Sequence, residues 1–337
     1  MRIANIDKLA DVIVRMIDRN DLVAAMAKFT TIVEPDKDEP NWWAGAPSAV
    51  YDPNADEFWL AVRMRTAEGA RGSRGYEIRL LKSKDGLNFT VQKRIHRNDM
   101  ELQVFERPAL VRTPEGKFCL YGCTSFLGQW AIWKLDAVDD PLDFDPTSFE
   151  VILHPPLNDT PHAALHGYKD PFILRIGDLY HMTVIGEAHK MGARPYHFIS
   201  KDGVKWRPWP SDIINGKPAT FFEATGWHNW STRPACLIPL KIGALLVYEG
   251  SHLNWYDAVY NLATGLAYTP DFTHWHDLTP DAPLLQSTTP GNFHTWRYSH
   301  WLPVKGQMFV YWEGACPNDT FVTRGATFPL DDLGTFH

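Results

Sequence analysis

The chain has 337 residues, 45% of them hydrophobic and 22% charged, which is enough to bury the core of one large domain or two ordinary ones. Its net charge of −7 and isoelectric point near 6.0 argue against a nucleic-acid partner, because a phosphate backbone requires a basic face. No apolar run approaches the roughly 20 residues that cross a bilayer, so we expect no membrane partner.

Residues 6–29 are the one stretch with convincing helical periodicity. Its apolar residues recur at a spacing close to 3.6, with charged residues between them: Ile6, Leu9, Ile13, Met16 and Ile17. Asn20-Asp21 interrupts the pattern and can cap a second short helix that reaches Phe29. We assign residues 1–34 to a helical leader, which could pack under the main domain or against a second subunit in a homo-oligomer.

Compartment and metal content are constrained by short-range patterns. Met1 to Asp18 has no uninterrupted apolar segment, and the four cysteines form no zinc-like C-x-x-C pair. His162 and His166 are four residues apart, but they lie in a loop with Pro161, so His166 is expected to line a polar substrate pocket. We expect a reduced, cytoplasmic protein with no cofactor and no metal.

Residues 41–330 repeat one pattern five times. A short apolar strand, usually started by a proline, leads through a turn, usually with Gly, into an aromatic-rich strand. The starts are about sixty residues apart, enough for one four-stranded blade each. They are Ala46-Pro47-Ser48-Ala49-Val50, Arg107-Pro108-Ala109-Leu110-Val111, Asp170-Pro171-Phe172-Ile173-Leu174, Arg233-Pro234-Ala235-Cys236-Leu237 and Ser299-His300-Trp301-Leu302. The pattern predicts an all-β fold, a five-bladed β-propeller, with a short N-terminal helical segment.

A second repeat marks a later turn of three blades. Residues 83–89 and 200–206 are near copies with the core Ser-Lys-Asp-Gly, and residues 269–275 are a looser third copy. An Asp that accepts bonds from nearby backbone N–H groups, followed by a Gly that tolerates positive φ, closes a tight turn. We assign these turns a structural role.

In a propeller the first strand of each blade lines a central channel, so the residues beside each repeat start share one funnel. The polar residues of this ring differ between blades, which favours a single asymmetric site, although a solvated channel could also carry them. The ring consists of Gly45-Ala46, Glu106-Arg107, Lys169-Asp170, Thr232-Arg233 and Tyr298-Ser299.

Further carboxylates follow the second strand of three blades, at Glu187, Glu249 and Glu313. Glycoside cleavage needs one carboxyl group that protonates the leaving oxygen and a carboxylate that activates water or attacks the anomeric carbon. An arginine beside one carboxylate lowers its pKa and apolar burial raises that of another, so one ring can supply both roles. The catalytic candidates are Glu106, Asp170, Glu249 and Glu313.

Substrate-binding candidates are the ring arginines and the aromatic residues that flank the funnel. Aromatic rings can stack on sugar faces, and each of these could equally belong to the core. The candidates are Arg107, Arg233, Trp43, Trp230, Trp301 and His300.

With these motifs, the chain resembles the five-bladed propeller glycosidases, the group that holds glycoside hydrolase families 32, 43, 62 and 130. Residues 167–180 look like the Asp-Pro blade start of that group, in which the Asp orients the site and tunes the pKa of the acid. Residues 63–89 look like the first blade of the mannoside phosphorylase family, number 130. The resemblance covers residues 41–330 and implies a propeller catalytic domain.

Three positions depart from the pattern of these families. Ala46 stands where the family 43 base would be, and Arg107 stands where family 130 has its general acid Asp. Arg233 stands where a catalytic Glu would be expected in the fourth blade. The resemblance therefore implies the scaffold and leaves the individual catalytic roles open.

We expect a glycoside hydrolase that acts on an oligosaccharide or glycoconjugate, with Asp170 orienting the site and Glu106, Glu249 or Glu313 supplying acid and base. We favour inversion, which places two carboxyl groups about 6.5–9.5 Å apart. The first alternative is an inverting phosphorylase, because arginines bind phosphate bidentately. The second is a non-catalytic carbohydrate-binding propeller, and the third is a scaffold that has lost its chemistry. The arginines available for phosphate are Arg63, Arg65, Arg71, Arg74, Arg107 and Arg233.

Overall fold

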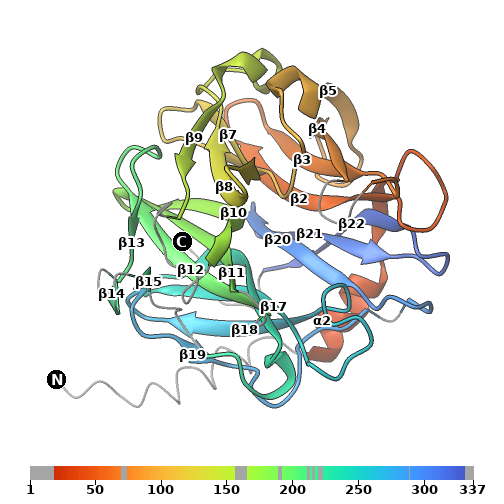
Figure 1. Ribbon diagram of the computed structural model, residues 1–337. Helices are drawn as coiled ribbons and strands as arrows, with labels where there is room; N and C mark the ends of the chain where they lie inside the picture. Colours follow the sequence, from red (N-terminus) through yellow and green to blue (C-terminus); the bar gives the residue numbers. More distant parts are fainter. Residues whose placement is uncertain are drawn as a thin grey trace.

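The computed structural model describes residues 19–69, 74–155, 165–188, 192–210, 213–214, 217–218, 223–287 and 289–330. The described chain is mainly β-structure, as predicted (Figure 1). Its α-helix is α2 (Arg19–Ala27), and the helical pattern predicted at residues 6–17 lies outside the described residues. Short 3₁₀ helices occupy Arg97–Met100, Pro141–Asp143, Pro146–Ser148 and Gly226–His228.

The strands of residues 43–208 form three antiparallel blades of four strands. Blade 1 contains β2 (Trp43–Asp52), β3 (Glu57–Arg65), β4 (Gly75–Ser83) and β5 (Thr90–His96). Blade 2 contains β6 (Ala109–Arg112), β7 (Phe118–Phe126), β8 (Gln129–Lys134) and β9 (Glu150–Leu153). Blade 3 contains β10 (Leu165–Ile176), β11 (Leu179–Ala188), β12 (Gly192–Ser200) and β13 (Arg207–Pro208).

The remaining strands form two further blades and one small hairpin. Blade 4 contains β16 (Ser231–Pro239), β17 (Ala244–Ser251), β18 (Ala263–Thr269) and β19 (His276–Asp277). Blade 5 contains β20 (Trp296–Val304), β21 (Gln307–Ala315), β22 (Phe321–Pro329) and the N-terminal strand β1 (Thr30–Val33). The hairpin joins β14 (Ile213–Ile214) to β15 (Lys217–Pro218).

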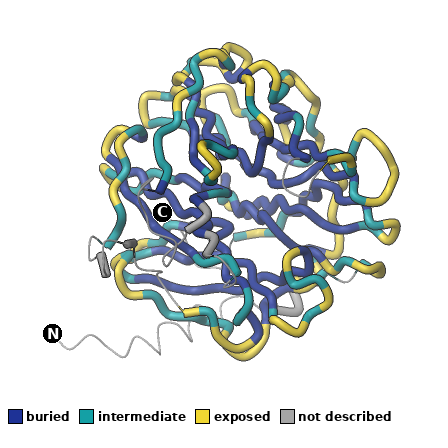
Figure 2. The backbone as a smooth tube through the Cα atoms, in the orientation of Figure 1, coloured by how far each residue is buried: buried dark blue, intermediate teal, exposed yellow. Residues whose placement is uncertain are grey.

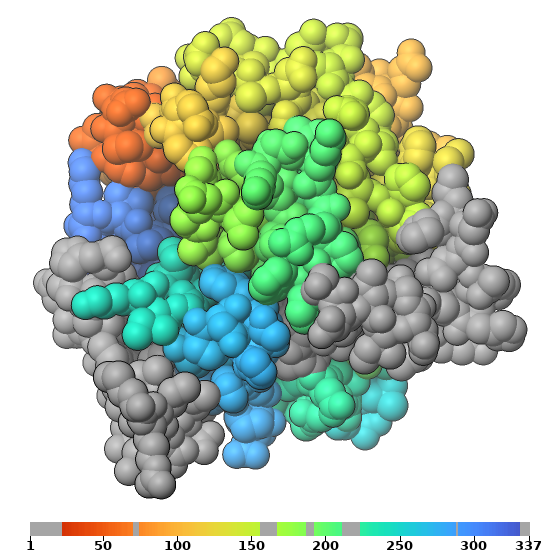
Figure 3. Space-filling view, turned by 90° about the vertical axis from the view of Figure 1, so that its left-hand side faces the viewer, coloured from red at the N-terminus to blue at the C-terminus, as the bar shows by residue number. Residues whose placement is uncertain are grey.

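The first strands of the blades form the inner wall of the ring. Each contacts the next, in the order β2, β6, β10, β16 and β20, and β20 contacts β2 again. This closed cycle of five inner strands is the arrangement of a β-propeller, and it confirms the predicted fold class. Figure 3 views the side where blade 3, in green, lies between yellow-green blade 2 and blue residues from the later part of the chain.

Blade 5 is completed by a strand that the sequence pattern missed. Residues 30–33 fall within the leader predicted as helical, yet they form β1 and pair antiparallel with β22, with Thr30 opposite Gly325. The segment Thr-Thr-Ile-Val is wholly β-branched, and it covers an edge of blade 5 that would otherwise be unpaired. Before it, α2 packs Leu22 and Met26 into the core of blades 4 and 5.

The predicted Asp turns are confirmed. Asp85 and Asp202 each accept two backbone N–H bonds through Oδ1, at 2.8 and 2.9 Å, and Asp271 does the same in the looser copy. Gly86 has φ of 75°, and its carbonyl accepts a 2.8 Å bond from the hydroxyl of Tyr311 in the neighbouring blade. The turns therefore also tie adjacent blades together.

Three inner strands share a backbone distortion beside the repeat start. Ala46, Asp170 and Tyr298 have φ of 52°, 55° and 54°, a left-handed conformation that costs about 1–2 kcal/mol for a non-glycine residue. The register of each strand shifts at the same place. Such bulges re-aim side chains and are common next to active sites. Burial is densest in the central strands, whereas the outer loops are exposed (Figure 2).

Candidate active site

The centre of the funnel is organised around Asp170. Its Oδ2 accepts hydrogen bonds from Arg233 Nη2 at 2.8 Å and from the Tyr298 hydroxyl at 3.2 Å. Its Oδ1 accepts a 3.3 Å bond from the backbone N–H of Arg107, and its own N–H donates to Cys123 Sγ. The inner strands of blades 3, 4 and 5, together with Arg107 two residues before β6, thus meet at one buried carboxylate.

Asp170 is ionised at neutral pH. Burial alone would raise its pKa, but the positive charges of Lys169, Arg233 and Arg63 and the bond from the Arg107 backbone outweigh burial and lower the pKa to about 2. A carboxylate held in this way can orient neighbouring groups and stabilise positive charge that develops on a sugar ring.

Glu249 is the cross-strand partner of Arg233 in the pairing of β16 with β17. Its environment raises its pKa, whereas that of Asp170 is lowered. Burial raises the pKa of Glu249 to about 7, although Arg233 and Arg107 and the 3.1 Å bond from the Ser299 backbone N–H act to lower it. Both protonation states are therefore populated near neutral pH. A carboxyl group of this kind is suited to general acid catalysis.

The other two predicted carboxylates are linked through Arg63. Arg63 Nη1 forms an ion pair with Glu106 Oε2, and its Nη2 lies 3.6 Å from Glu313 Oε2. Arg297 Nε holds the other oxygen of Glu313 at 2.6 Å. A Cβ at Gly45 would overlap the Glu313 carboxylate, which explains why that position of the ring is a glycine. Glu313 is therefore fixed between two arginines.

Glu106 differs from Glu313 in access. The Glu106 side chain is 8% exposed and that of Glu313 is 0% exposed. The ion pair of Glu106 with Arg63 uses Oε2, which leaves Oε1 outside that ion pair. Of this linked pair, Glu106 is the better candidate for a base.

The funnel carries a surplus of buried arginine. Arg107 is 1% exposed, and its Nε, Nη1 and Nη2 have no hydrogen-bond partner among the described residues. Its nearest ring neighbours are Phe172 and Tyr298, at 5.9 and 5.8 Å. Six buried arginines lie among or beside the four carboxylates, so the site is cationic although the whole chain has a net charge of −7. The six are Arg63, Arg65, Arg74, Arg107, Arg233 and Arg297.

Two predicted sugar-stacking residues are instead core residues. Trp43 is buried, with Arg65 4.1 Å and Arg297 4.5 Å from its ring centroid, so it supports the arginines and offers no face to a sugar. Trp301 lies in the hydrophobic core of blades 4 and 5. Because burial is set by neighbouring blades, the local sequence could not separate these residues from exposed ones.

The remaining predicted binding residues have mixed outcomes. His300 is buried, and its Nδ1 accepts a 3.2 Å bond from the Ala49 backbone N–H. Burial, with a smaller contribution from the charge of Arg107, lowers the pKa of His300 to about 3. Trp230 is half-buried, and its carbonyl accepts a bond from Arg194 Nη1 at 2.8 Å. The side chain of His166 lies outside the described residues, as does Arg71.

The site also contains a residue that sequence reasoning missed. Arg297 precedes Tyr298 in the same way that Glu106 precedes Arg107, but blade 5 has Ser299 where the other blades have proline. Because that proline is absent, the sequence pattern predicts Tyr298-Ser299 as the ring pair of blade 5, one residue after the true pair Arg297-Tyr298. Aligning Tyr298 with Asp170 by its place before the apolar strand would have identified Arg297.

Metal and membrane features are not found in the described part of the chain. No group of three or more His, Cys, Asp or Glu residues there could hold a metal ion. None of the described helices is long and apolar enough to span a membrane.

Comparison with known proteins gives relatives by structure alone. No family model matches the chain, and no curated protein matches it by sequence. A glycosyl hydrolase from Bacteroides ovatus is 16% identical, with a TM-score of 0.63 over 89% of this chain and 93% of that one. A β-1,2-mannobiose phosphorylase from Listeria innocua is 13% identical, with a TM-score of 0.61 over 90% and 95%.

A third solved structure, described in work on family 130 mannoside phosphorylases and on hydrolases that target β-1,2-mannosidic linkages, is 17% identical, with a TM-score of 0.62 over 90% and 96%. These similarities extend over nearly the whole of each chain. The protein therefore has the fold of the propeller glycoside hydrolases and phosphorylases, as the sequence resemblance implied.

Proposed function

We propose that this protein is a glycoside hydrolase that cleaves glycosidic bonds of an oligosaccharide or glycoconjugate in the propeller funnel. The observation that carries the proposal is the pair Asp170 and Glu249, two buried carboxyl groups whose pKa values are displaced in opposite directions. Such a displacement separates the roles of acid and base at one pH. The similarity in fold to known glycoside hydrolases supports the same reaction class.

The roles follow from protonation and access. Glu249 donates its proton to the leaving oxygen, and Asp170 remains charged and stabilises the positive charge that forms at the anomeric carbon. Glu106, through Oε1, accepts a proton from the attacking water, and Arg63 holds it in place. Because water attacks directly, the product has inverted anomeric configuration, which nuclear magnetic resonance of the first product formed can measure.

The test is a screen of nitrophenyl glycosides and short oligosaccharides with four proteins. These are the wild type, Glu249→Gln, Glu106→Gln and the matched surface control Glu150→Gln, whose residue is exposed on β9. We expect the first two variants to lose about 10²–10⁴-fold in rate, the usual contribution of a positioned acid or base, and the control to retain activity. Equal rates in all four proteins would refute the assignment.

Phosphorolysis is a second candidate, and Arg107 is the observation that favours it. Arginine stays protonated in proteins, and the buried Arg107 guanidinium makes no hydrogen bond among the described residues, so it has donors free for an anion. Inorganic phosphate would satisfy it bidentately. Running the same screen with and without phosphate decides between the two: a rate that rises with phosphate and a sugar phosphate product would replace hydrolysis by phosphorolysis.

A carbohydrate-binding propeller without catalysis is the alternative from another class. It predicts that sugars bind to wild type and to Glu249→Gln with equal affinity and that neither protein releases product. The asymmetry of the funnel favours catalysis, because one Asp, two Arg, one Ala and one Tyr occupy the five equivalent positions. These positions are Ala46, Arg107, Asp170, Arg233 and Tyr298.

The setting of the protein is also part of the proposal. A cytoplasmic location is supported by four cysteines that are all free. We assign residues 41–330 to the catalytic domain, with β1 completing its last blade from the N-terminal side. Val23 of α2 and Phe29 just after it are partly exposed and could join two copies, which light scattering of the purified protein can measure.

A further inference from the structure

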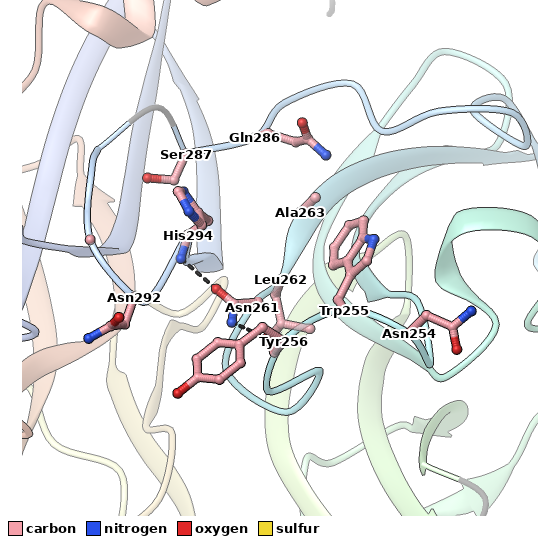
Figure 4. Close-up of a pocket in the computed structure, with 11 residues that line it drawn as sticks. Asn254, Trp255, Tyr256, Asn261, Leu262, Ala263, Gln286, Ser287, Asn292 and His294 are labelled. Carbon is pink, nitrogen blue, oxygen red and sulfur yellow. Dashed lines mark hydrogen bonds between the residues drawn. The ribbon is translucent and has the colours of Figure 1, made fainter.

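A pocket separate from the arginine-lined centre opens where blades 4 and 5 meet. It has a volume of about 680 Å³, within the roughly 300–1,000 Å³ of small-ligand sites. We call it the side pocket and define it by Trp255, Tyr256, Asn261, Gln286, Asn292 and His294. In Figure 4, Trp255 and Asn254 lie on one side of it and Asn292 and His294 on the other.

The side pocket faces the same end of the propeller as the funnel. One wall follows β17, which ends at Ser251, two residues after Glu249. The opposite wall precedes β20, in which Arg297 is the second residue. Tyr260, next to Asn261, accepts a 3.2 Å hydrogen bond from Arg74, and its ring lies 5.2 Å from the Arg297 guanidinium. The residue next to Asn261 therefore contacts the arginines beside the funnel, and the two sites lie close together.

The chemistry of the two sites is different. None of the described residues that line the side pocket is Asp, Glu, Lys or Arg, whereas the funnel is built from charged groups. The lining supplies neutral donors and acceptors together with aromatic surface, and Tyr256 is 73% exposed. Neutral sugars need this combination, because their hydroxyls form hydrogen bonds and their C–H faces pack on aromatic rings. The polar groups come from Asn254, Asn261, Gln286, Ser287, Asn292 and His294.

The walls of the side pocket are held in place before any ligand arrives. Asn261 Oδ1 accepts a 2.5 Å bond from the His294 backbone N–H, and Asn261 Nδ2 donates to the carbonyl of Tyr256 (Figure 4). Trp255 stacks on Trp227, with ring centroids 6.3 Å apart and an interplanar angle of 23°. Asn261 thus joins both walls, and the stack fixes Trp255. Such preorganisation reduces the entropy lost on binding.

We propose that the side pocket binds an uncharged sugar residue, as an accessory carbohydrate site beside the funnel. A glycan that extends beyond the sugar residues bound in the funnel would place a neutral sugar residue in the side pocket. The site requires neither a protonated Glu249 nor an anion at Arg107, so its binding function does not depend on the proposed hydrolysis. It offers a charged ligand no Asp, Glu, Lys or Arg among its described lining residues, so it favours uncharged ones.

The test uses isothermal titration calorimetry with neutral gluco-, manno-, galacto- and xylo-oligosaccharides. We compare the wild type with four variants: Trp255→Ala, Gln286→Ala, Trp255→Phe and Leu253→Ala. Leu253 is a matched control, because it is on the same loop and 60% exposed but does not line the pocket. At least one saccharide is expected to bind wild type and Leu253→Ala equally, with at least tenfold weaker binding to both alanine variants of pocket residues.

Trp255→Phe keeps an aromatic face, so it is expected to retain most of the affinity. It serves as a control for loss of binding through misfolding. Failure of every neutral saccharide to bind wild type would overturn the proposal, as would equal binding to all variants with intact circular dichroism. Cleavage of a small chromogenic glycoside reports on the funnel alone. Its loss in Glu249→Gln, with saccharide binding retained, separates the side pocket from the proposed catalysis.

Discussion

Replacing Glu249 by Gln is predicted to stabilise the protein at alkaline pH while it removes activity. The wild-type carboxyl group is buried, and burial raises its pKa from the ordinary 4.5 to about 7. Because the pKa is higher in the fold than in the unfolded chain, the native state favours the protonated form. The stability that protonated Glu249 contributes is therefore fully present below pH 4.5 and is lost as pH rises through about 7.

The magnitude follows from the displacement of the pKa. At about 1.4 kcal/mol for each pH unit, the difference between 4.5 and 7 corresponds to a loss of about 3 kcal/mol above pH 7. Gln stays neutral at every pH and does not incur this loss. Its amide oxygen can still accept the bond that Ser299 N–H donates to Oε1, so the local structure is preserved.

The assay is the melting temperature of wild type and Glu249→Gln measured from pH 5 to pH 8. We expect similar values near pH 5 and a melting temperature several degrees higher for the variant at pH 8. The exposed control Glu150→Gln should track wild type at both ends of the range. A variant that is no more stable than wild type at pH 8 would contradict the view that Glu249 is a buried, strained acid.

Three further substitutions test other parts of the funnel. Arg107→Met removes a buried guanidinium that makes no hydrogen bond, so the ligand-free protein should be more stable by on the order of 1–4 kcal/mol and melt at a higher temperature. The same variant should lose at least 100-fold in kcat/KM. Gly45→Ala forces a Cβ against the Glu313 carboxylate and should lower both stability and activity. Its control is Gly177→Ala, whose added Cβ would meet no atom within 4 Å and which should cost only about 1 kcal/mol of stability. Tyr298→Phe deletes a hydroxyl donor to the central carboxylate and should lower kcat with little change in fold, as circular dichroism will report.

Much of the fold was predictable because it depends on local signals. Prolines at 47, 108, 171 and 234 start apolar strands, and the structure places them in or just before β2, β6, β10 and β16. The Asp85 turn was predictable for the same reason, since its bonds reach only two and three residues ahead. β1 was missed because its partner, β22, is nearly 300 residues away in sequence.

The site was only partly predictable, because its properties arise between blades. The sequence identified Asp170 and Glu249 as candidates, but not their pKa displacements. The lowered pKa of Asp170 depends on Arg233 and Arg63 from other blades, and the raised pKa of Glu249 depends on its burial. Trp43 has the residue type of a sugar platform, and only the packing shows that Arg65 and Arg297 cover it. Residue type and spacing do not specify which groups reach the centre of a ring.

The most direct test of the account is the pH dependence of kcat/KM for a cleaved glycoside, measured for wild type and Glu249→Gln. The account predicts that the wild-type value falls as pH rises through about 7, because Glu249 loses the proton that it must donate. The residual activity of Glu249→Gln should lack that falling limb. A wild-type profile without the limb, or the same limb in both proteins, would contradict the assignment of Glu249 as the acid.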